Sequence, residues 1–164
     1  MGQARGGVGE RLLDLWTRLS GVPGGRWAYS RMLGWMVPYS GSIRATVIEL
    51  EPGHARVELR DRRRVRNHLR SIHAIALMNL GELTTGIALN CGLPSSSRAI
   101  LVGMSMEYLK KARGTLVAEC LCEVPEVAED REIELTGEIL DASGKTVARA
   151  RARWRVGPVP RSSN

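Results

Sequence analysis

The spacing of apolar residues along the chain changes from a helical period to a strand period near residue 43. Before that point, two apolar runs recur at helical spacing, separated by Pro23-Gly24-Gly25 and ended by Pro38. Proline and glycine at these places are typical helix boundaries. We therefore predict an accessory helical segment over residues 1–42 that packs against the main domain. Its polar faces hold few Lys or Arg residues, which disfavours an interfacial membrane helix.

From residue 43 onward the apolar residues follow the period of strands. Residues 43–50 and 55–60 flank the turn sequence Glu51-Pro52-Gly53-His54 and predict a hairpin. Four more strands are predicted after residue 97, as two further hairpins. These hairpins pair Ala99–Lys110 with Leu116–Val124, and Glu132–Leu140 with Val147–Val156.

The last predicted hairpin has a register that its own charges support. If Asp141 opposes Gly144, Glu134 lies opposite Arg151 and Glu132 opposite Arg153. Apolar residues then pair on the other face, as the alternation of a strand requires. The arginine row from 149 to 155 is therefore largely neutralised, which weakens a nucleic-acid interpretation of the basic charge.

Between the two groups of strands, residues 74–90 predict one long helix that is apolar almost all round. A helix without a polar face is buried on most sides. An antiparallel sheet wrapped around this helix provides that burial. The pattern thus predicts an α+β domain over residues 43–157, followed by a flexible tail over 158–164.

Composition narrows the class of protein. At 164 residues with a net charge of +7, the chain is long enough for one domain with a proper core. Its three cysteines include a Cys120-x-Cys122 pair, a spacing that suits neither a disulfide nor a zinc site. We predict free thiols and a cytoplasmic location. The apolar runs are shorter than the ~18 residues of a spanning helix, so we expect no membrane insertion.

Glu82 is a carboxylate inside the predicted apolar helix. Burial there raises the pKa of a carboxylate and costs stability unless the group has a partner. Carboxylates kept in such positions are often general bases. The alternative is that Glu82 is partly exposed, or that a neighbour such as Asn79 or Thr85 satisfies it.

The start of the same helix is a second candidate site. His73 and Ala74 stand where free amide N–H groups and the positive end of the helix dipole face the preceding loop. Such donors suit the oxyanion that forms when a thioester or ester carbonyl is attacked. The simpler alternatives are that His73 only caps the helix and that Asn67 is only a turn residue.

The spacing of Asn67, His73 and Glu82 resembles that of hotdog-fold acyl-CoA thioesterases of the phenylacetate-pathway type. In that family an Asn lies six residues before the His of a His-Gly-Gly turn, and a carboxylate follows nine residues after it on the central helix; both spacings occur here. The likeness runs from about residue 43 to 156. It includes the segment 106–114, which is similar to the family's Tyr-Leu-x-Pro-Ala-Arg-Gly strand and turn.

Three positions depart from the family pattern. Ala74 and Ile75 replace the two glycines of the turn, and Lys111 replaces a proline. The alanine still offers its backbone N–H, whereas the branched side chain of Ile75 lies where the acyl thioester would contact the protein.

The resemblance implies a hotdog fold and hydrolysis of an acyl-CoA or acyl-carrier thioester. In this scheme the Ala74 N–H polarises the carbonyl, Glu82 activates a water, Asn67 orients the water or the carboxylate, and His73 shapes the turn. It also implies a homodimer or a dimer of dimers, with Asn67 and Glu82 of one site on different subunits. No metal is implied, and no cofactor other than coenzyme A as part of the substrate.

Basic residues near this segment have a role in the same scheme. Guanidinium and ammonium groups bind phosphates, so we predict that these residues hold coenzyme A or the phosphopantetheine of a carrier; solvated charge is the alternative. The candidates are Arg64, Arg66, Lys110, Lys111 and Arg113, within a wider basic group that includes Arg60, Arg62, Arg63 and Arg70.

Three other functions compete with hydrolysis. The first is a non-catalytic hotdog domain that binds acyl-CoA or an acyl chain, for which Ile75 argues. The second is a hotdog dehydratase or hydratase, whose motifs the sequence lacks. The third is an RNA-binding module, which the basic charge favours. The scarcity of aromatic residues outside the N-terminal segment argues against it.

Overall fold

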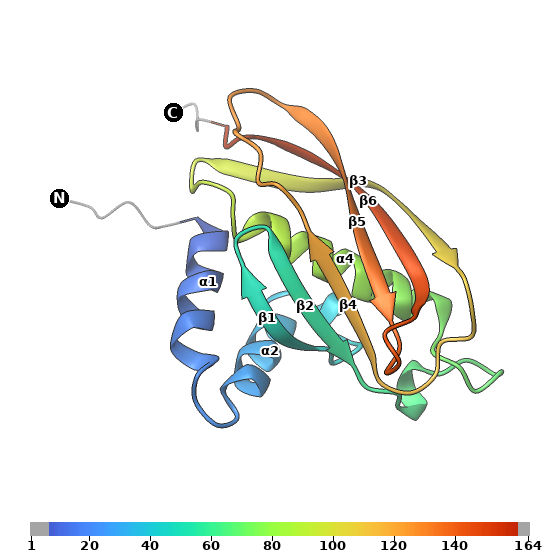
Figure 1. The fold of residues 1–164 in the computed structure, drawn as a ribbon. Helices are drawn as coiled ribbons and strands as arrows, with labels where there is room; N and C mark the ends of the chain where they lie inside the picture. Colours follow the sequence, from blue (N-terminus) through green and yellow to red (C-terminus); the bar gives the residue numbers. More distant parts are fainter. Residues whose placement is uncertain (1–6, 161–164) are drawn as a thin grey trace.

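A computed structural model describes residues 7–160, in which one six-stranded antiparallel sheet curves around a single long helix (Figure 1). The helices are α1 (Val8–Leu19), α2 (Gly25–Met36), α3 (Pro38–Gly41) and α4 (Ala74–Asn90), with a 3-10 turn at Arg63–Val65. The strands are β1 (Thr46–Glu51), β2 (His54–Leu59), β3 (Ser97–Tyr108), β4 (Leu116–Leu121), β5 (Arg131–Leu140) and β6 (Thr146–Pro158). The sheet order is β1-β2-β4-β5-β6-β3.

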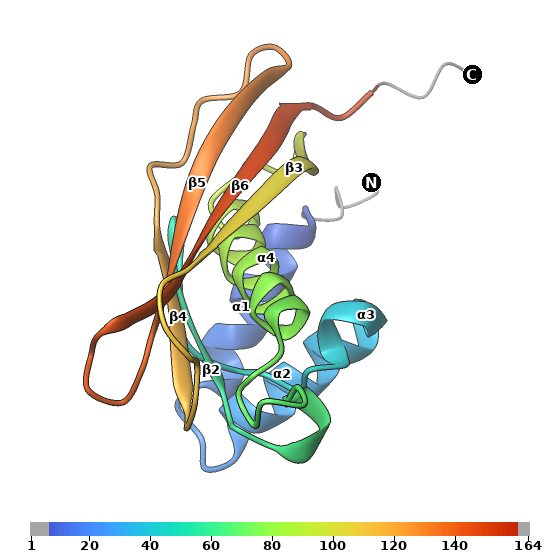
Figure 2. The ribbon, with the colours of Figure 1, turned by 90° about the vertical axis from the view of Figure 1, so that its right-hand side faces the viewer.

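The helix α4 lies against the concave face of the sheet, and α3 lies on its other side (Figure 2). Its predicted bounds are confirmed. Leu80 and Leu89 are fully buried. A Cβ on Gly81 would clash with the Ala150 side chain on β6, so glycine lets the helix approach the sheet closely. This arrangement confirms the predicted α+β hotdog fold.

The two N-terminal helices pack beside β1 and α4. The ring of Trp16 on α1 meets that of Tyr29 on α2 edge to face, with 5.1 Å between centroids, a favourable aromatic geometry. The Val47 N–H on β1 donates to the hydroxyl of Ser30 on α2 at 2.9 Å. Both helices are therefore fixed to the domain through buried contacts on one face.

The predicted hairpin between the third and fourth strands is wrong. β3 pairs with β6, and β4 pairs with β2 and β5. The N–H groups of Leu109 and Lys110 both donate to the Val147 carbonyl on β6. This contact holds the end of β3 beside β6, so residues 109–115 must carry the chain across to the other half of the sheet.

The register of the last hairpin differs from the prediction by two residues. Glu134 pairs with Arg153, and Glu132 with Arg155. The turn is wider than predicted because the Asp141 N–H donates to the carbonyl of Lys145. An even shift leaves every side chain on its predicted face. The arginine row is accordingly still paired with carboxylates, through Arg149–Glu138, Arg149–Glu107, Arg151–Glu107, Arg153–Glu132 and Arg155–Glu132.

Parts of both predicted terminal segments lie outside the described residues. Residues 161–164 of the predicted tail and residues 1–6 of the predicted accessory segment lie outside the described residues. Cys91, Cys120 and Cys122 are free thiols, as predicted. No helix in the described part of the chain is long and apolar enough to cross a membrane.

Candidate active site

Glu82 lies on the face of α4 that is turned away from the sheet and toward α3. Its carboxylate accepts a hydrogen bond of 3.1 Å from the hydroxyl of Ser40. Partial burial raises the pKa of Glu82, and the Ser40 hydrogen bond offsets part of that rise. Neither Asn79 nor Thr85 satisfies the carboxylate, because their side chains bond to backbone carbonyls instead.

Two glycines bring α3 close to α2, and α3 also bonds to α4. The backbones of Gly34 on α2 and Gly41 on α3 touch, and a Cβ on Gly41 would overlap the Gly34 carbonyl oxygen. One turn before Glu82 along α4, the Asn79 side chain donates to the Tyr39 carbonyl at 3.1 Å. The Asn79 Oδ1 is buried and has no hydrogen-bond partner among the described residues. The segment before β1 therefore covers this face of α4.

A mostly apolar hollow of about 250 Å³ opens beside Glu82. Glu82 is the charged residue in its wall, and Ser40 and Asn90 are the polar neutral ones. The apolar wall comes from α1, α2, α4 and β6 and consists of Val8, Leu12, Leu33, Val37, Leu83, Gly86, Ile87 and Trp154.

His73 forms the N-cap of α4. Its ring Nδ1 accepts a hydrogen bond of 3.1 Å from the Ile75 N–H. The backbone N–H of His73 donates to the Val65 carbonyl at 2.7 Å. The Ala74 N–H has no acceptor within residues 7–160. From the end of β3, the Tyr108 hydroxyl donates to the Ala74 carbonyl at 3.2 Å. The Ala74 N–H thus stands unoccupied at the positive end of the helix dipole.

A second, more polar hollow of about 540 Å³ adjoins this helix start. Ile75 lies in its wall and is 51% exposed, so its side chain does not plug the hollow. His73 and Asn79 lie in the same wall. The remaining wall consists of Tyr39, Gly41, Ser42, Ile43, Arg44, Arg64, Val65, Arg66 and Ala76.

Asn67 organises its own loop. Its Oδ1 accepts from the N–H of Leu69 at 2.9 Å and from both the N–H and the hydroxyl of Ser71 at 3.2 Å. Asn67 borders a hollow formed by Arg63, Arg66 and Arg70. Within one chain the structure therefore does not bring Asn67 and Glu82 together, because they line different hollows.

The predicted phosphate-binding cations divide into two groups. Arg64 and Arg66 lie in the wall of the polar hollow, although Arg66 also donates to Asp61 at 2.6 Å. Lys110 is held by Asp141 in the β5–β6 turn.

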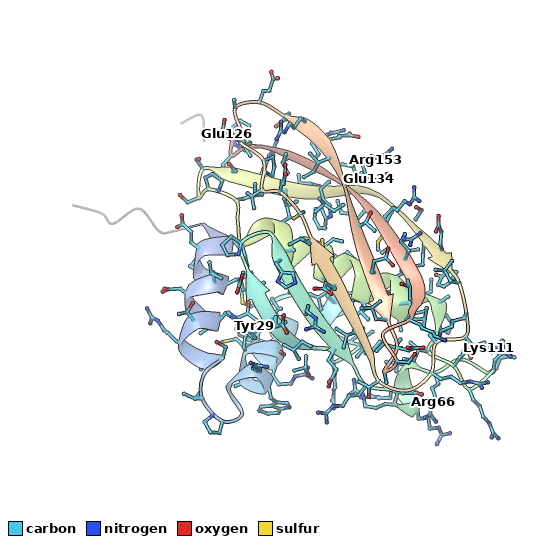
Figure 3. All side chains as sticks on the ribbon, viewed as in Figure 1. Tyr29, Arg66, Lys111, Glu126, Glu134 and Arg153 are labelled. Atoms are coloured by element: carbon cyan, nitrogen blue, oxygen red, sulfur yellow. The ribbon has the colours of Figure 1, made fainter. Side chains whose placement is uncertain are left out.

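Lys111 and Arg113 belong to the loop after β3 and are exposed. Lys111 and Arg66 project at the same end of the molecule (Figure 3). The Asp61 carboxylate connects the two loops by also accepting the Gly114 N–H at 2.9 Å. Of the predicted set, the structure thus gathers Arg64 and Arg66 at the helix start and directs Lys110 elsewhere.

Sequence reasoning did not identify Ser40 or Tyr108. Ser40 lies 42 residues before Glu82, and no local pattern connects them. For Tyr108 a signal was present, because it belongs to the segment 106–114 that resembles the thioesterase strand.

Comparison with known proteins places this geometry in a family. Residues 25–156 match the family model described as "Domain of unknown function (DUF4442)". A search of curated proteins finds no match. The crystal structure of genomics APC5556 is 30% identical with a TM-score of 0.78, over 91% of this chain and 99% of that one.

More distant structures share the fold. A Pseudomonas aeruginosa protein, PA5026, described as of unknown function and a probable thioesterase, is 21% identical with a TM-score of 0.70, over 84% of this chain and 97% of that one. The thioesterase HI1161 from Haemophilus influenzae is 10% identical with a TM-score of 0.68, over 80% and 92%. By its sequence match and its hotdog fold, the chain belongs to the DUF4442 family.

Proposed function

We propose that the protein hydrolyses an acyl thioester. The observation that carries this proposal is the half-buried Glu82 carboxylate, with its raised pKa, beside an apolar hollow on the same helix whose first N–H is unoccupied. The hollow offers space for an acyl group, and the helix start offers a donor for an oxyanion. Structures described as thioesterases share the fold, which supports this choice of reaction.

In the proposed reaction Glu82 acts as the general base. It takes a proton from a water whose oxygen attacks the thioester carbon, and the resulting oxyanion accepts a hydrogen bond from the Ala74 N–H. Collapse of the tetrahedral intermediate breaks the carbon–sulfur bond, and the proton on Glu82 passes to the departing thiolate. Asn67 orients the water through its amide nitrogen, since its oxygen is engaged within the loop. His73, as the N-cap of α4, positions the Ala74 N–H.

The proposed site is completed by a second copy of the chain. Asn67 and Glu82 line different hollows of one chain, so one subunit must bring its Glu82 to the Asn67 loop of the other. Among residues 7–160 no strand pairs with the outer edge of β3, which is 12 residues long; such an edge favours pairing with another strand. We propose a homodimer built on this edge.

The cations near the helix start suit the phosphates of a thiol carrier such as coenzyme A. Arg64 and Arg66 border the polar hollow next to the helix start, and Lys111 and Arg113 extend this basic surface at the same end of the molecule. Phosphates bound there would leave the thioester pointing toward Ala74. A phosphopantetheine carrier would present the same chemistry to the same residues.

The test is thiol release from a panel of acyl-CoA thioesters. With Glu82→Gln the rate is expected to fall ~10²–10⁴-fold, the usual loss of a positioned base. Glu126→Gln serves as a matched control, because Glu126 is an exposed carboxylate on a distant loop (Figure 3). Equal rates in wild type and Glu82→Gln would overturn the assigned base, and an absence of hydrolysis across the panel would overturn the reaction.

A further inference from the structure

The helix α2 is apolar on two opposite faces. Its inner face is buried through Tyr29 and Leu33. On its outer face and the start of α3, Trp27 is 64% exposed, Trp35 83% and Tyr39 73%. We call this the aromatic face; it consists of Trp27, Met32, Trp35, Met36 and Tyr39. An exposed apolar patch of this kind marks a binding surface.

The surroundings of the aromatic face are basic. From Leu15 to Ile48 the sequence contains no Asp or Glu. The same stretch contains four arginines. Arg18 is paired with Asp14, and the other three are Arg26, Arg31 and Arg44. A partner for this surface must therefore be apolar where it meets the aromatic face and anionic at its margin.

The fold adds further cations to this margin. Arg31 on α2 donates to the Ala45 carbonyl at 2.7 Å, and Arg62 donates to the Ile43 carbonyl. Burial lowers the pKa of both guanidinium groups, and the neighbouring charge of Arg44 lowers it further. Each of these arginines donates through Nη2 to backbone carbonyls rather than to carboxylates, so their charges remain available to an anionic partner.

The charge decides between the possible partners. A second copy of the chain would place the same basic margin against itself across a two-fold axis, and like charges oppose such an interface. A nucleic acid would use the aromatic rings, but it offers no apolar layer for Met32 and Met36. Tryptophan and tyrosine prefer the boundary between headgroups and acyl chains in a bilayer, and arginines bind the phosphates above it.

We propose that the aromatic face docks on the surface of an anionic lipid bilayer. Trp27, Trp35 and Tyr39 lie at the level of the headgroups, and the arginine margin contacts lipid phosphates. The sequence disfavoured an interfacial helix because α2 itself holds few cations. The fold supplies the missing charge from Arg44 and Arg62, which lie next to α2 only in three dimensions. The proposal goes beyond thioester hydrolysis and does not depend on it.

The test is co-sedimentation of the full chain with vesicles of phosphatidylcholine alone or mixed with phosphatidylglycerol. We expect binding to the mixed vesicles and a blue shift of tryptophan emission. Trp16 and Trp154 are buried, so the shift reports on Trp27 and Trp35. Trp35→Ser is expected to weaken partitioning about tenfold or more. Leu121→Ser is the matched control, because Leu121 is 80% exposed on the opposite face of the sheet.

A second pair of variants tests the charge. Arg26→Gln is expected to weaken binding to anionic vesicles roughly fivefold. Arg131→Gln, at an exposed position on β5, is expected to leave it unchanged. Circular dichroism checks that each variant is folded.

Three results would overturn the proposal. The first is no binding to either vesicle, and the second is equal binding by wild type and Trp35→Ser. The third is the absence of vesicle binding together with one of two other findings. Either the wild-type chain self-associates in sedimentation and Trp35→Ser does not, or the wild-type chain binds polyuridylate and Trp35→Ser does not. That last pair of findings would assign the aromatic face to a second copy or to RNA.

Discussion

The Ser40 hydroxyl donates a hydrogen bond of 3.1 Å to the Glu82 carboxylate, across 42 residues of sequence. This contact and the bond from Asn79 to the Tyr39 carbonyl join the N-terminal helical segment to the helix that carries the candidate base. It stabilises the ionised form of Glu82, whereas burial stabilises the neutral form. Through Ser40 the N-terminal segment therefore offsets part of the rise that burial gives the pKa of Glu82.

Ser40→Ala is expected to move the acidic limb of the pH–rate profile to higher pH. The hydrogen bond from Ser40 lowers the pKa of Glu82, so its loss leaves burial unopposed and raises that pKa further. A general base must be ionised, and activity would then require a higher pH. The measurement is kcat/KM for a thioester across pH. Ser96→Ala, an exposed serine at the other end of α4, is the control; an unmoved limb in Ser40→Ala would contradict the prediction.

Glu82→Gln is expected to make the protein more stable at neutral pH while removing its activity. The pKa of Glu82 is raised in the folded state, so the folded protein holds a proton that the unfolded chain has lost. Stability conferred by the neutral carboxyl is therefore present at low pH and declines as pH rises from the ordinary glutamate value toward the folded pKa.

Glutamine carries no charge and keeps an oxygen that can accept from Ser40. Urea unfolding of the wild type and of Glu82→Gln, at pH values below the ordinary glutamate pKa and above the raised pKa of Glu82, measures the difference in their free energies of unfolding. A stability gap that does not grow with pH would contradict the raised pKa.

Periodicity predicted the elements of the fold better than their pairing. The bounds of α4 and the faces of β5 and β6 follow from local patterns of apolar residues. The pairing of β3 with β6 does not, because the two strands are far apart in sequence and the turn chemistry at Gly114 resembled that of a hairpin. The two-residue shift of the last hairpin has a similar origin, since the width of the turn at Asp141 depends on one backbone hydrogen bond.

The candidate site was only partly predictable for a comparable reason. His73 and Ala74 are adjacent in sequence, and the cap geometry follows directly from a helix that begins there. Ser40 and Tyr108 reach α4 from distant elements, and no spacing rule contains them. In the proposed dimer, Asn67 and Glu82 of one site come from different chains. Spacing along a single sequence does not reveal contacts between two chains.

His73→Ala is expected to lower the free energy of unfolding by about 1 kcal/mol and to reduce activity with it. The variant loses the N-cap bond from the Ile75 N–H to the ring, which loosens the first turn and the position of the Ala74 donor. His73→Asn offers an oxygen cap and is expected to restore the stability and most of the activity. Thermal unfolding and thiol release measure the two effects; if Asn restores stability without activity, the imidazole itself takes part in the reaction.

Gly41→Ala is expected to damage the site through packing. A Cβ there would overlap the Gly34 carbonyl, which must push α3 away from α2 and displace Ser40 from the Glu82 carboxylate. Overpacking of this kind costs about 1–3 kcal/mol. The pH–rate profile should shift in the same direction as in Ser40→Ala. Gly21→Ala is the matched control because a Cβ there meets nothing within 4 Å; equal behaviour of the two variants would show that the contact is not tight.

Ile75→Ala is expected to leave the fold intact and to improve turnover of thioesters with bulky acyl groups. The Ile75 side chain is 51% exposed in the wall of the polar hollow, so its removal creates no core cavity, and alanine is the better helix former. The substitution leaves the backbone N–H of residue 75, which donates to the His73 ring, unchanged. KM for branched or aromatic acyl-CoA is expected to fall relative to that for acetyl-CoA. If activity is instead lost on every substrate, the isoleucine side chain contacts the acyl group productively and is a substrate-binding residue.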